Sequence, residues 1–255
     1  MNVLVCVKRV AMVGAKIVLT PDGRDVDVSQ LGFTVSPHEE CAVEEAVRIV
    51  ERLGGTVTVL TLGPPAAVEQ LRDAASIGAT RLVHLVTDGE EFDALATAEV
   101  IAEVIRSREA SEGVYDLVLF GNEAADSGDY QVAVRVGAAL GRGCVNAIKQ
   151  LDVSVERVAA RREFRGGDES FDLSVPCVVG VKEGINLPRY PSLPGRMRAK
   201  KIVVEESPVG GRSSTVRRVA LRTPEEPRQR AELLGTGTEG AEKLVELFVE
   251  WGVLA

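Results

Sequence analysis

One polar loop carries most of the residues in this 255-residue chain that could hold a ligand. It follows an apolar run at residues 116–120 and leads directly into a segment of helical period at 133–140. Small residues let a ligand approach the backbone, and the free N–H groups at a helix start favour a phosphate. The loop consists of Gly121, Asn122, Glu123, Ala124, Ala125, Asp126, Ser127, Gly128, Asp129, Tyr130, Gln131 and Val132. It is a candidate phosphate site, but an ordinary strand-to-helix loop in which Asp126 and Asp129 are solvated caps fits the same pattern.

The other residues that could do chemistry form no catalytic constellation. The patterns G-x-G-x-x-G and G-x-x-x-x-G-K-[ST] are absent from the sequence. His84 is expected to be a hydrogen-bonded residue of an apolar strand, and His38 lies where a helix begins. Glu44 and Glu45 fall in the middle of the same helix, where a solvated face is expected. These residues therefore offer no acid/base constellation for catalysis.

The four cysteines are expected to be small core residues. Cys6, Cys41, Cys144 and Cys177 are widely spaced in apolar surroundings, and no C-x-x-C occurs. The sequence supports neither a zinc site nor a disulfide framework.

The elements that must position these residues alternate along the chain. Short β-branched runs at 2–7, 56–62, 81–86, 116–120 and 177–181 alternate with longer segments of helical period. This pattern predicts an α/β protein with a Rossmann-like, doubly wound, mostly parallel sheet. Ser36, Pro37 and Glu39 form a capping-box pattern that predicts the start of the first helix. An antiparallel extension is expected within residues 147–173, and a hairpin over residues 16–28.

Four loops should converge at one edge of this sheet. In a parallel α/β sheet, ligands bind beyond the carboxyl ends of the strands. The loops are the one after Cys6, residues 36–39, the one after Leu62, and residues 121–132. This edge is the expected ligand site.

Composition excludes two classes of partner. The net charge of −8, with scattered lysine and arginine, gives no basic face for nucleic acid. No apolar run approaches the roughly 20 residues that span a bilayer, and the N-terminus is unlike a signal peptide. We therefore expect no nucleic-acid binding, no direct membrane insertion and a cytoplasmic location.

Several blocks, taken in order as far as about residue 201, resemble the beta subunit of electron transfer flavoproteins. The most specific are Ala-Val-Glu-Glu-Ala-Val at 42–47 and Asn-Leu-Pro-Arg-Tyr at 186–190. The others are Val5-Cys6-Val7-Lys8-Arg9-Val10, Gly63-Pro64, Gly78-Ala79-Thr80-Arg81 with His84, Asp116-Leu117-Val118-Leu119 with the loop that follows, and Met197-Arg198-Ala199-Lys200-Lys201.

The resemblance implies a heterodimer in which an alpha subunit makes most contacts to a redox-active FAD, while the beta subunit holds a structural AMP. Electrons would pass from flavin dehydrogenases, such as acyl-CoA dehydrogenases, toward a membrane quinone oxidoreductase. Val13 and His38 would lie near the flavin. Carried over by position, the AMP contacts are Cys6, Ser36, Pro37, His38, Glu39, Leu62 and the loop from Gly121 to Val132, which are the four loops named above.

Two segments depart from the family pattern. The family often has Asn-Pro-Phe-Cys where residues 36–39 read Ser-Pro-His-Glu, and Gln-Thr-Gly where residues 131–133 read Gln-Val-Ala. Val132 has no hydroxyl, so backbone amides or Tyr130 would have to bind the phosphate. His38 replaces an aromatic residue that faces the flavin in relatives. It would either give the flavin a hydrogen bond or a charge, or act as a packing substitute.

Residues 183–200 resemble the recognition loop of the family, in which an apolar side chain anchors the carrier to its dehydrogenase. Ile185 is the expected exposed anchor, and packing of Ile185 on its own subunit is the alternative. The docking residues that the resemblance implies are Gly184, Ile185, Asn186, Leu187, Pro188, Arg189 and Tyr190.

Two regions are expected, a nucleotide-binding body of residues 1–202 and an extended arm of residues 203–255. Proline and glycine recur in the arm, which should end in a helix at about 240–252. Its Leu244, Phe248 and Trp251 form an apolar face that we expect to pack on the alpha subunit.

Two other functions stay open. In a bifurcating variant a second FAD occupies the AMP position, but residues 126–133 only partly match that group's Asp-Gly-x-Thr-x-Gln-Val-Gly-Pro pattern. A stand-alone adenine-nucleotide module needs a glycine-rich loop after the first strand, where this chain has Val-Lys-Arg-Val at 7–10.

Overall fold

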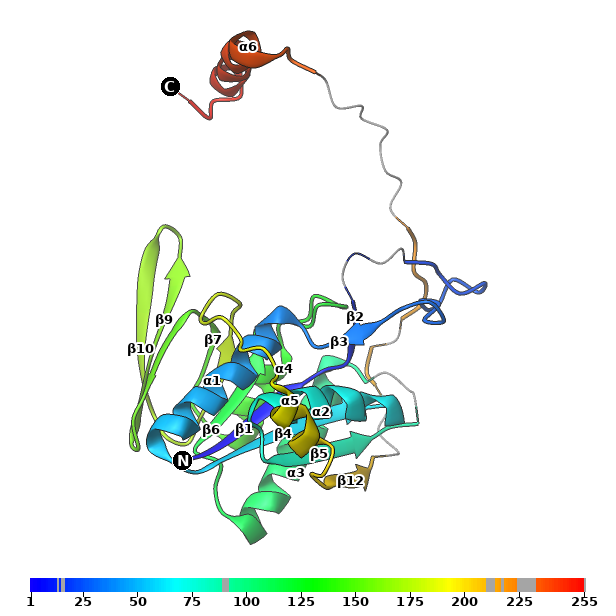
Figure 1. Cartoon of the computed structure of the whole chain (residues 1–255), viewed down its shortest axis with the longest axis vertical. Helices are drawn as coiled ribbons and strands as arrows, with labels where there is room; N and C mark the ends of the chain where they lie inside the picture. Colours follow the sequence, from blue (N-terminus) through cyan, green and yellow to red (C-terminus); the bar gives the residue numbers. More distant parts are fainter. Residues whose placement is uncertain are drawn as a thin grey trace. The chain divides into compact units, whose positions relative to one another are not determined.

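The β-branched runs form a seven-stranded sheet in the computed structural model of the chain (Figure 1). Its strands are β1 (Asn2–Val7), β4 (Thr56–Gly63), β5 (Arg81–Val86), β6 (Leu117–Gly121), β7 (Cys144–Ile148), β11 (Cys177–Val181) and β12 (Val204–Pro208). They lie in the order β12-β5-β4-β1-β6-β11-β7, and each neighbouring pair is parallel. The predicted α/β class is therefore confirmed. The structure describes residues 1–12, 14, 17–88, 92–209, 214–216, 218–223 and 233–254.

Helices cover both faces of the sheet, as a doubly wound fold requires. The α-helices are α1 (Pro37–Leu53), α2 (Val68–Ile77), α3 (Ala94–Glu112), α4 (Val132–Leu140), α5 (Leu193–Ala199) and α6 (Gly237–Glu250), and a short 3₁₀ turn, η1 (Pro65–Ala67), precedes α2. Alternate residues of β1 point to opposite faces. Val3 and Val5 pack with α1 and α2, whereas Leu4 and Cys6 pack with α3 and α4. Each buried Val or Leu contributes about 1.5–3 kcal/mol, so the two layers fix the sheet.

The first helix begins where its capping box predicts. Ser36 is the N-cap and its hydroxyl accepts the Glu39 N–H, while the Glu39 carboxylate accepts the Ser36 N–H. Pro37 occupies the first helical position, where no N–H is needed. This local pattern fixes where the polypeptide enters α1.

An antiparallel sheet of three strands extends the body. It consists of β8 (Gln150–Val153), β9 (Arg157–Phe164) and β10 (Gly167–Ser174), in the order β10-β9-β8. Val158 and Ala160 pack into the same core as α1. Arg165 and Gly166 both adopt positive φ, which is typical of a tight hairpin turn. The predicted antiparallel extension is thus present, and a smaller pair joins β2 (Val10–Ala11) to β3 (Phe33–Thr34).

Helix α3 extends to Glu112, with an Arg108–Glu112 ion pair in its last turn, and Gly113 after it takes a positive φ. One boundary differs from the sequence prediction. Residues 204–208, expected in the arm, form β12 and pair with β5. The chain accordingly divides into units of residues 1–219 and 220–255, and the expected boundary after residue 202 lies inside the sheet.

The second unit contains α6, which begins three residues earlier than expected and buries none of its own residues. Phe248 and Trp251 lie against each other, with ring centroids 6.3 Å apart. None of the helices in the described ranges combines the length and apolar character needed to cross a membrane.

Candidate functional site

The four predicted loops lie at the carboxyl edge of the sheet, around its central strands. Strand β1 pairs with β4 on one side and with β6 on the other, and the chain order reverses between β1 and β6. Such a switch point is where ligands bind in open α/β sheets. Cys6 pairs with Phe120 of β6, and Leu62 follows the Thr61 that pairs with Val7. The topology therefore brings the predicted segments to one edge.

Glu39 links three of these segments. One carboxylate oxygen accepts the Ser36 N–H at 3.0 Å and the other accepts the Lys8 N–H at 2.9 Å. A Cβ at Gly121 would lie only 2.7 Å from Cγ of Glu39, so the loop after β6 approaches α1 as closely as glycine allows. The loop after β1, the start of α1 and the loop after β6 are thus in direct contact.

The Glu39 carboxyl is almost completely buried, with 6% of the residue exposed. Burial raises its pKa to about 8, against the opposing effect of the hydrogen bonds from Ser36 and Lys8. The Lys8 ammonium forms an ion pair with Asp126, at 2.8 Å between Nζ and Oδ2. Lys8 was not selected from the sequence as a site residue, although its place directly after β1 is a signal that it lies at this edge.

The loop of residues 121–132 is held by backbone hydrogen bonds, both within the loop and to β11. Asn122 N–H donates to the Val181 carbonyl, and the Ala124 N–H donates to the Asp129 carbonyl. Gly128 takes a left-handed conformation with φ 65°, and Asp129 accepts the Gln131 N–H at 2.7 Å. Residues 125–128 are exposed. No side chain caps α4, which begins at Val132.

His38 joins two further loops. Its Nδ1 accepts the Glu183 N–H at 2.8 Å, and its Nε2 lies 3.4 Å from a Glu123 carboxylate oxygen. The acceptor role of Nδ1 assigns the ring proton to Nε2, facing Glu123. Hydrogen bonds from Tyr130 and then from His38 hold the pKa of Glu123 below its ordinary value. A direct hydrogen bond from His38 to a flavin would therefore require one of these partners to be released. Val13, the other expected flavin neighbour, lies outside the described residues.

The cysteines, the second histidine and Glu44 can each be compared with expectation. All four cysteines are free; Cys6, Cys41 and Cys177 are buried and Cys144 is partly buried. His84 is buried in β5 and bonds the Gly63 carbonyl, as expected. Within the described ranges, no group of three His, Cys, Asp or Glu side chains is placed to hold a metal. Glu44 is only 1% exposed and binds two arginines, so the expected solvated role for Glu44 was wrong.

The recognition loop lies along α1 and begins after β11. Ile185, expected to be exposed, is partly buried against the core that includes α1. Leu187 and Tyr190 instead are 85% and 90% exposed. The structure therefore packs Ile185 on its own chain and presents Leu187 and Tyr190, while the docking role of the loop stays a prediction.

Comparison with known proteins identifies the family to which this chain belongs. A parallel α/β sheet with helices on both faces and loops gathered at its switch point defines the Rossmann-like, doubly wound class of folds. Residues 26–210 match the family model described as electron transfer flavoprotein domain. Proteins named electron transfer flavoprotein subunit beta are 34% identical in Bacillus subtilis (81% of this chain, 78% of the relative) and 33% identical in Bradyrhizobium diazoefficiens (100% of each). A third, in Syntrophomonas wolfei, is 33% identical over 88% of this chain and 86% of its own.

This chain belongs to the electron transfer flavoprotein beta subunit family. The family supports a role in electron transport with a flavin, as a carrier. The subunit name implies pairing with an alpha subunit.

Proposed function

We propose that this chain holds a structural AMP at the carboxyl edge of its sheet, and that its alpha subunit makes most of the contacts to the redox-active FAD. The heterodimer then carries electrons from flavin dehydrogenases, such as acyl-CoA dehydrogenases, toward a membrane quinone oxidoreductase. FAD supplies the redox chemistry. This chain supplies the nucleotide pocket and the surface that docks the partner.

The observation that carries the AMP site is the difference between the two helix N-termini at the edge. At α1, the capping box pairs the Glu39 N–H with the Ser36 hydroxyl and the Ser36 N–H with the Glu39 carboxyl, and acidic residues lie in the first turn. At α4, no side-chain cap and no acidic residue in the first turn are present. An uncapped helix start attracts a phosphate through its free N–H groups and its dipole. The residues around α4 therefore fit a monophosphate.

The rest of the nucleotide would lie across the loops that converge on β1. Gly121 and Gly128 provide backbone without side chains, and Leu62 and Val132 both pack against one apolar cluster at this edge. Ser36, Pro37 and His38 border the same edge from α1. Asp126, held by Lys8, and Tyr130 are the polar side chains that we expect near the ribose or the phosphate.

The nucleotide content of the purified heterodimer tests the proposal. The complex with its alpha subunit is denatured, and the released nucleotides are separated and quantified by absorbance. One AMP and one FAD per heterodimer are expected, because the start of α4 fits a monophosphate and most flavin contacts are proposed to lie in the alpha subunit. Two FAD and no AMP would instead establish the bifurcating variant. A nucleotide-loaded chain that forms no complex with an alpha subunit would point to a stand-alone module.

A further inference from the structure

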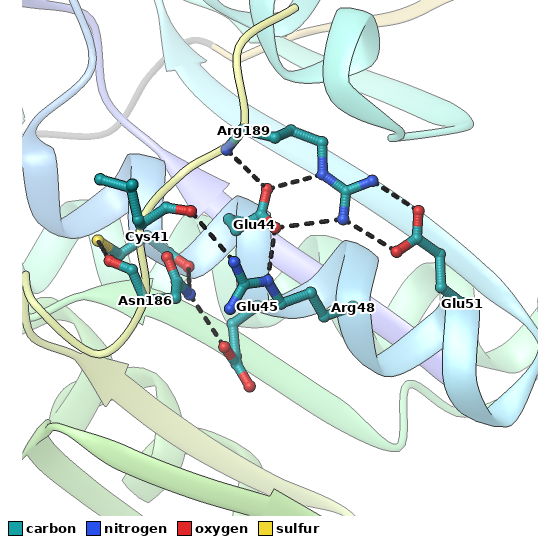
Figure 2. A network of polar contacts seen from close by, with 8 residues as sticks. Cys41, Glu44, Glu45, Arg48, Glu51, Asn186 and Arg189 are labelled. Atoms are coloured by element: carbon teal, nitrogen blue, oxygen red, sulfur yellow. Dashed lines mark hydrogen bonds and ion pairs between the residues drawn. The ribbon is translucent and has the colours of Figure 1, made fainter.

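A buried carboxylate on α1 holds the recognition loop, and Figure 2 shows its surroundings. One oxygen of Glu44 accepts the backbone N–H of Arg189 at 3.1 Å and its Nε at 2.9 Å. The other accepts Nη2 of Arg189 at 3.2 Å and Nε of Arg48 at 2.6 Å. Glu44 thus binds the backbone of the loop directly and also pairs with two guanidinium groups.

Neighbouring bonds extend this attachment along the loop. Arg48, oriented by Glu44, donates to the Leu187 carbonyl at 3.1 Å. The Asn186 side-chain amide donates to the Cys41 carbonyl at 3.0 Å and to Glu45 at 2.9 Å. These contacts fix the loop at residues 186, 187 and 189 against α1.

Glu44 differs from the other acidic residues of the network by its burial and by the groups to which it hydrogen-bonds. Burial raises the pKa of its carboxyl, but the hydrogen bonds from Arg189 and Arg48 outweigh that effect and the net pKa is below its ordinary value. Glu51 also contacts the Arg189 guanidinium, at 2.6 and 2.9 Å, but its side chain is half exposed and touches no loop backbone in these bonds. Among the hydrogen bonds of the described residues, those of Glu44 alone join both Arg48 and Arg189.

We propose that Glu44 is the positioning residue of the recognition loop: it fixes the backbone from Asn186 to Tyr190 before any partner arrives, and so presents Leu187 and Tyr190 in one orientation. This inference rests on the proposed docking function of the loop. A loop ordered in advance loses less conformational entropy on binding. Removal of Glu44 should therefore weaken docking through loop order, while the residues that touch the partner stay unchanged.

Hydrogen exchange in the purified heterodimer tests the positioning role without any dehydrogenase. In Glu44→Gln, the Arg189 amide, followed in the peptide that contains residues 186–190, should exchange at least tenfold faster, because its N–H loses a charged acceptor. Glu51→Gln makes the same charge change on the same helix and should alter exchange less than threefold. Arg189 is partly exposed, so Arg189→Gln provides a second variant if Glu44→Gln folds poorly. The double variant Glu44→Gln and Arg189→Gln should exchange no faster than either single variant. Unchanged exchange in both Glu44→Gln and Arg189→Gln overturns the proposal.

Reduction kinetics then separate loop order from contact. The probe is a reduced acyl-CoA dehydrogenase of the same organism, with the heterodimer as electron acceptor. Glu44→Gln should raise the KM for the heterodimer about tenfold with kcat within twofold, and Leu187→Ala should raise KM without changing exchange. If Leu187→Ala impairs reduction while Glu44→Gln changes neither exchange nor KM, the positioning role is wrong and docking stands. If the dehydrogenase does not reduce the wild-type heterodimer at all, the proposed docking function fails whatever the exchange data show.

Discussion

The carboxyl group of Glu39 is almost completely buried, at the contact between the loop after β1 and the loop after β6. Its two backbone bonds give the site its shape. Its burial also makes its protonation part of the folding equilibrium, because burial penalises the charged form.

Stability should therefore depend on pH through Glu39. Its pKa is raised from 4.5 to about 8 in the folded chain, so the folded state binds the proton more tightly than the unfolded state. The resulting stabilisation is complete below pH 4.5 and is lost as pH rises toward 8, by up to a few kcal/mol. Chemical denaturation of the heterodimer at pH 5 to 8.5 should show this loss in the wild type. Glu39→Gln should flatten the profile, and parallel profiles for the two proteins would contradict the assignment.

At the scale of residues, the sequence reveals roles that depend on near neighbours and conceals those that depend on topology. Ser36, Pro37 and Glu39 lie within one turn, so the capping box was predictable. The bond from Lys8 to Glu39 joins residues 31 apart, and the bond from Arg189 to Glu44 joins residues 145 apart. No local sequence pattern indicates hydrogen bonds between residues so far apart in the chain, which explains why Glu44 was interpreted as solvated and Ile185 as exposed.

The uncapped start of α4 is a property of the whole element, and a charge placed there tests the phosphate site. Val134 is exposed in the first turn. A carboxylate at this position interacts favourably with the helix dipole but repels a phosphate bound at the same end of the helix. Val134→Asp should therefore lose most of its AMP, measured by nucleotide extraction.

Val134→Asn is the matched control, since it has the same shape without the charge. It should retain AMP at the wild-type level. Equal AMP content in the wild type and both variants would mean that the phosphate does not lie at the N-terminus of α4.

Elements whose pattern is periodic were the most predictable. The five apolar runs became β1, β4, β5, β6 and β11 within about one residue of their expected ends. The strand at 204–208 was missed because its sequence, Val-Glu-Glu-Ser-Pro, is polar and ends in proline. Such a sequence suits an edge strand, where one side faces no neighbour, and only the pairing with β5 identifies it.

On the scale of the whole molecule, assembly with the alpha subunit should depend on the second unit. Leu244 and Phe248 of α6 and Trp251 at its C-cap recur at helical spacing, and Leu244 and Trp251 are exposed. A chain that ends at Gly235 should bind the alpha subunit at least tenfold more weakly, measured by titration or analytical ultracentrifugation, because this apolar face is lost.

The first unit should fold unchanged in that truncated chain. The double variant Glu242→Gln and Glu246→Gln alters the opposite side of α6 and should assemble like the wild type. Full-strength assembly of the truncated chain would show that α6 has no part in the interface.

The order of the strands has a consequence for synthesis on the ribosome. Strand β12 is the last of the sheet to be made, yet it covers β5, which is translated more than a hundred residues earlier. Until residue 208 has emerged, the N–H and C=O groups of β5 on that side have no strand to pair with, and an unpaired edge can recruit another chain. A nascent chain that stalls before β12 is therefore at greater risk of aggregation than one that stalls after it, because the sheet is completed only after residue 208 has emerged.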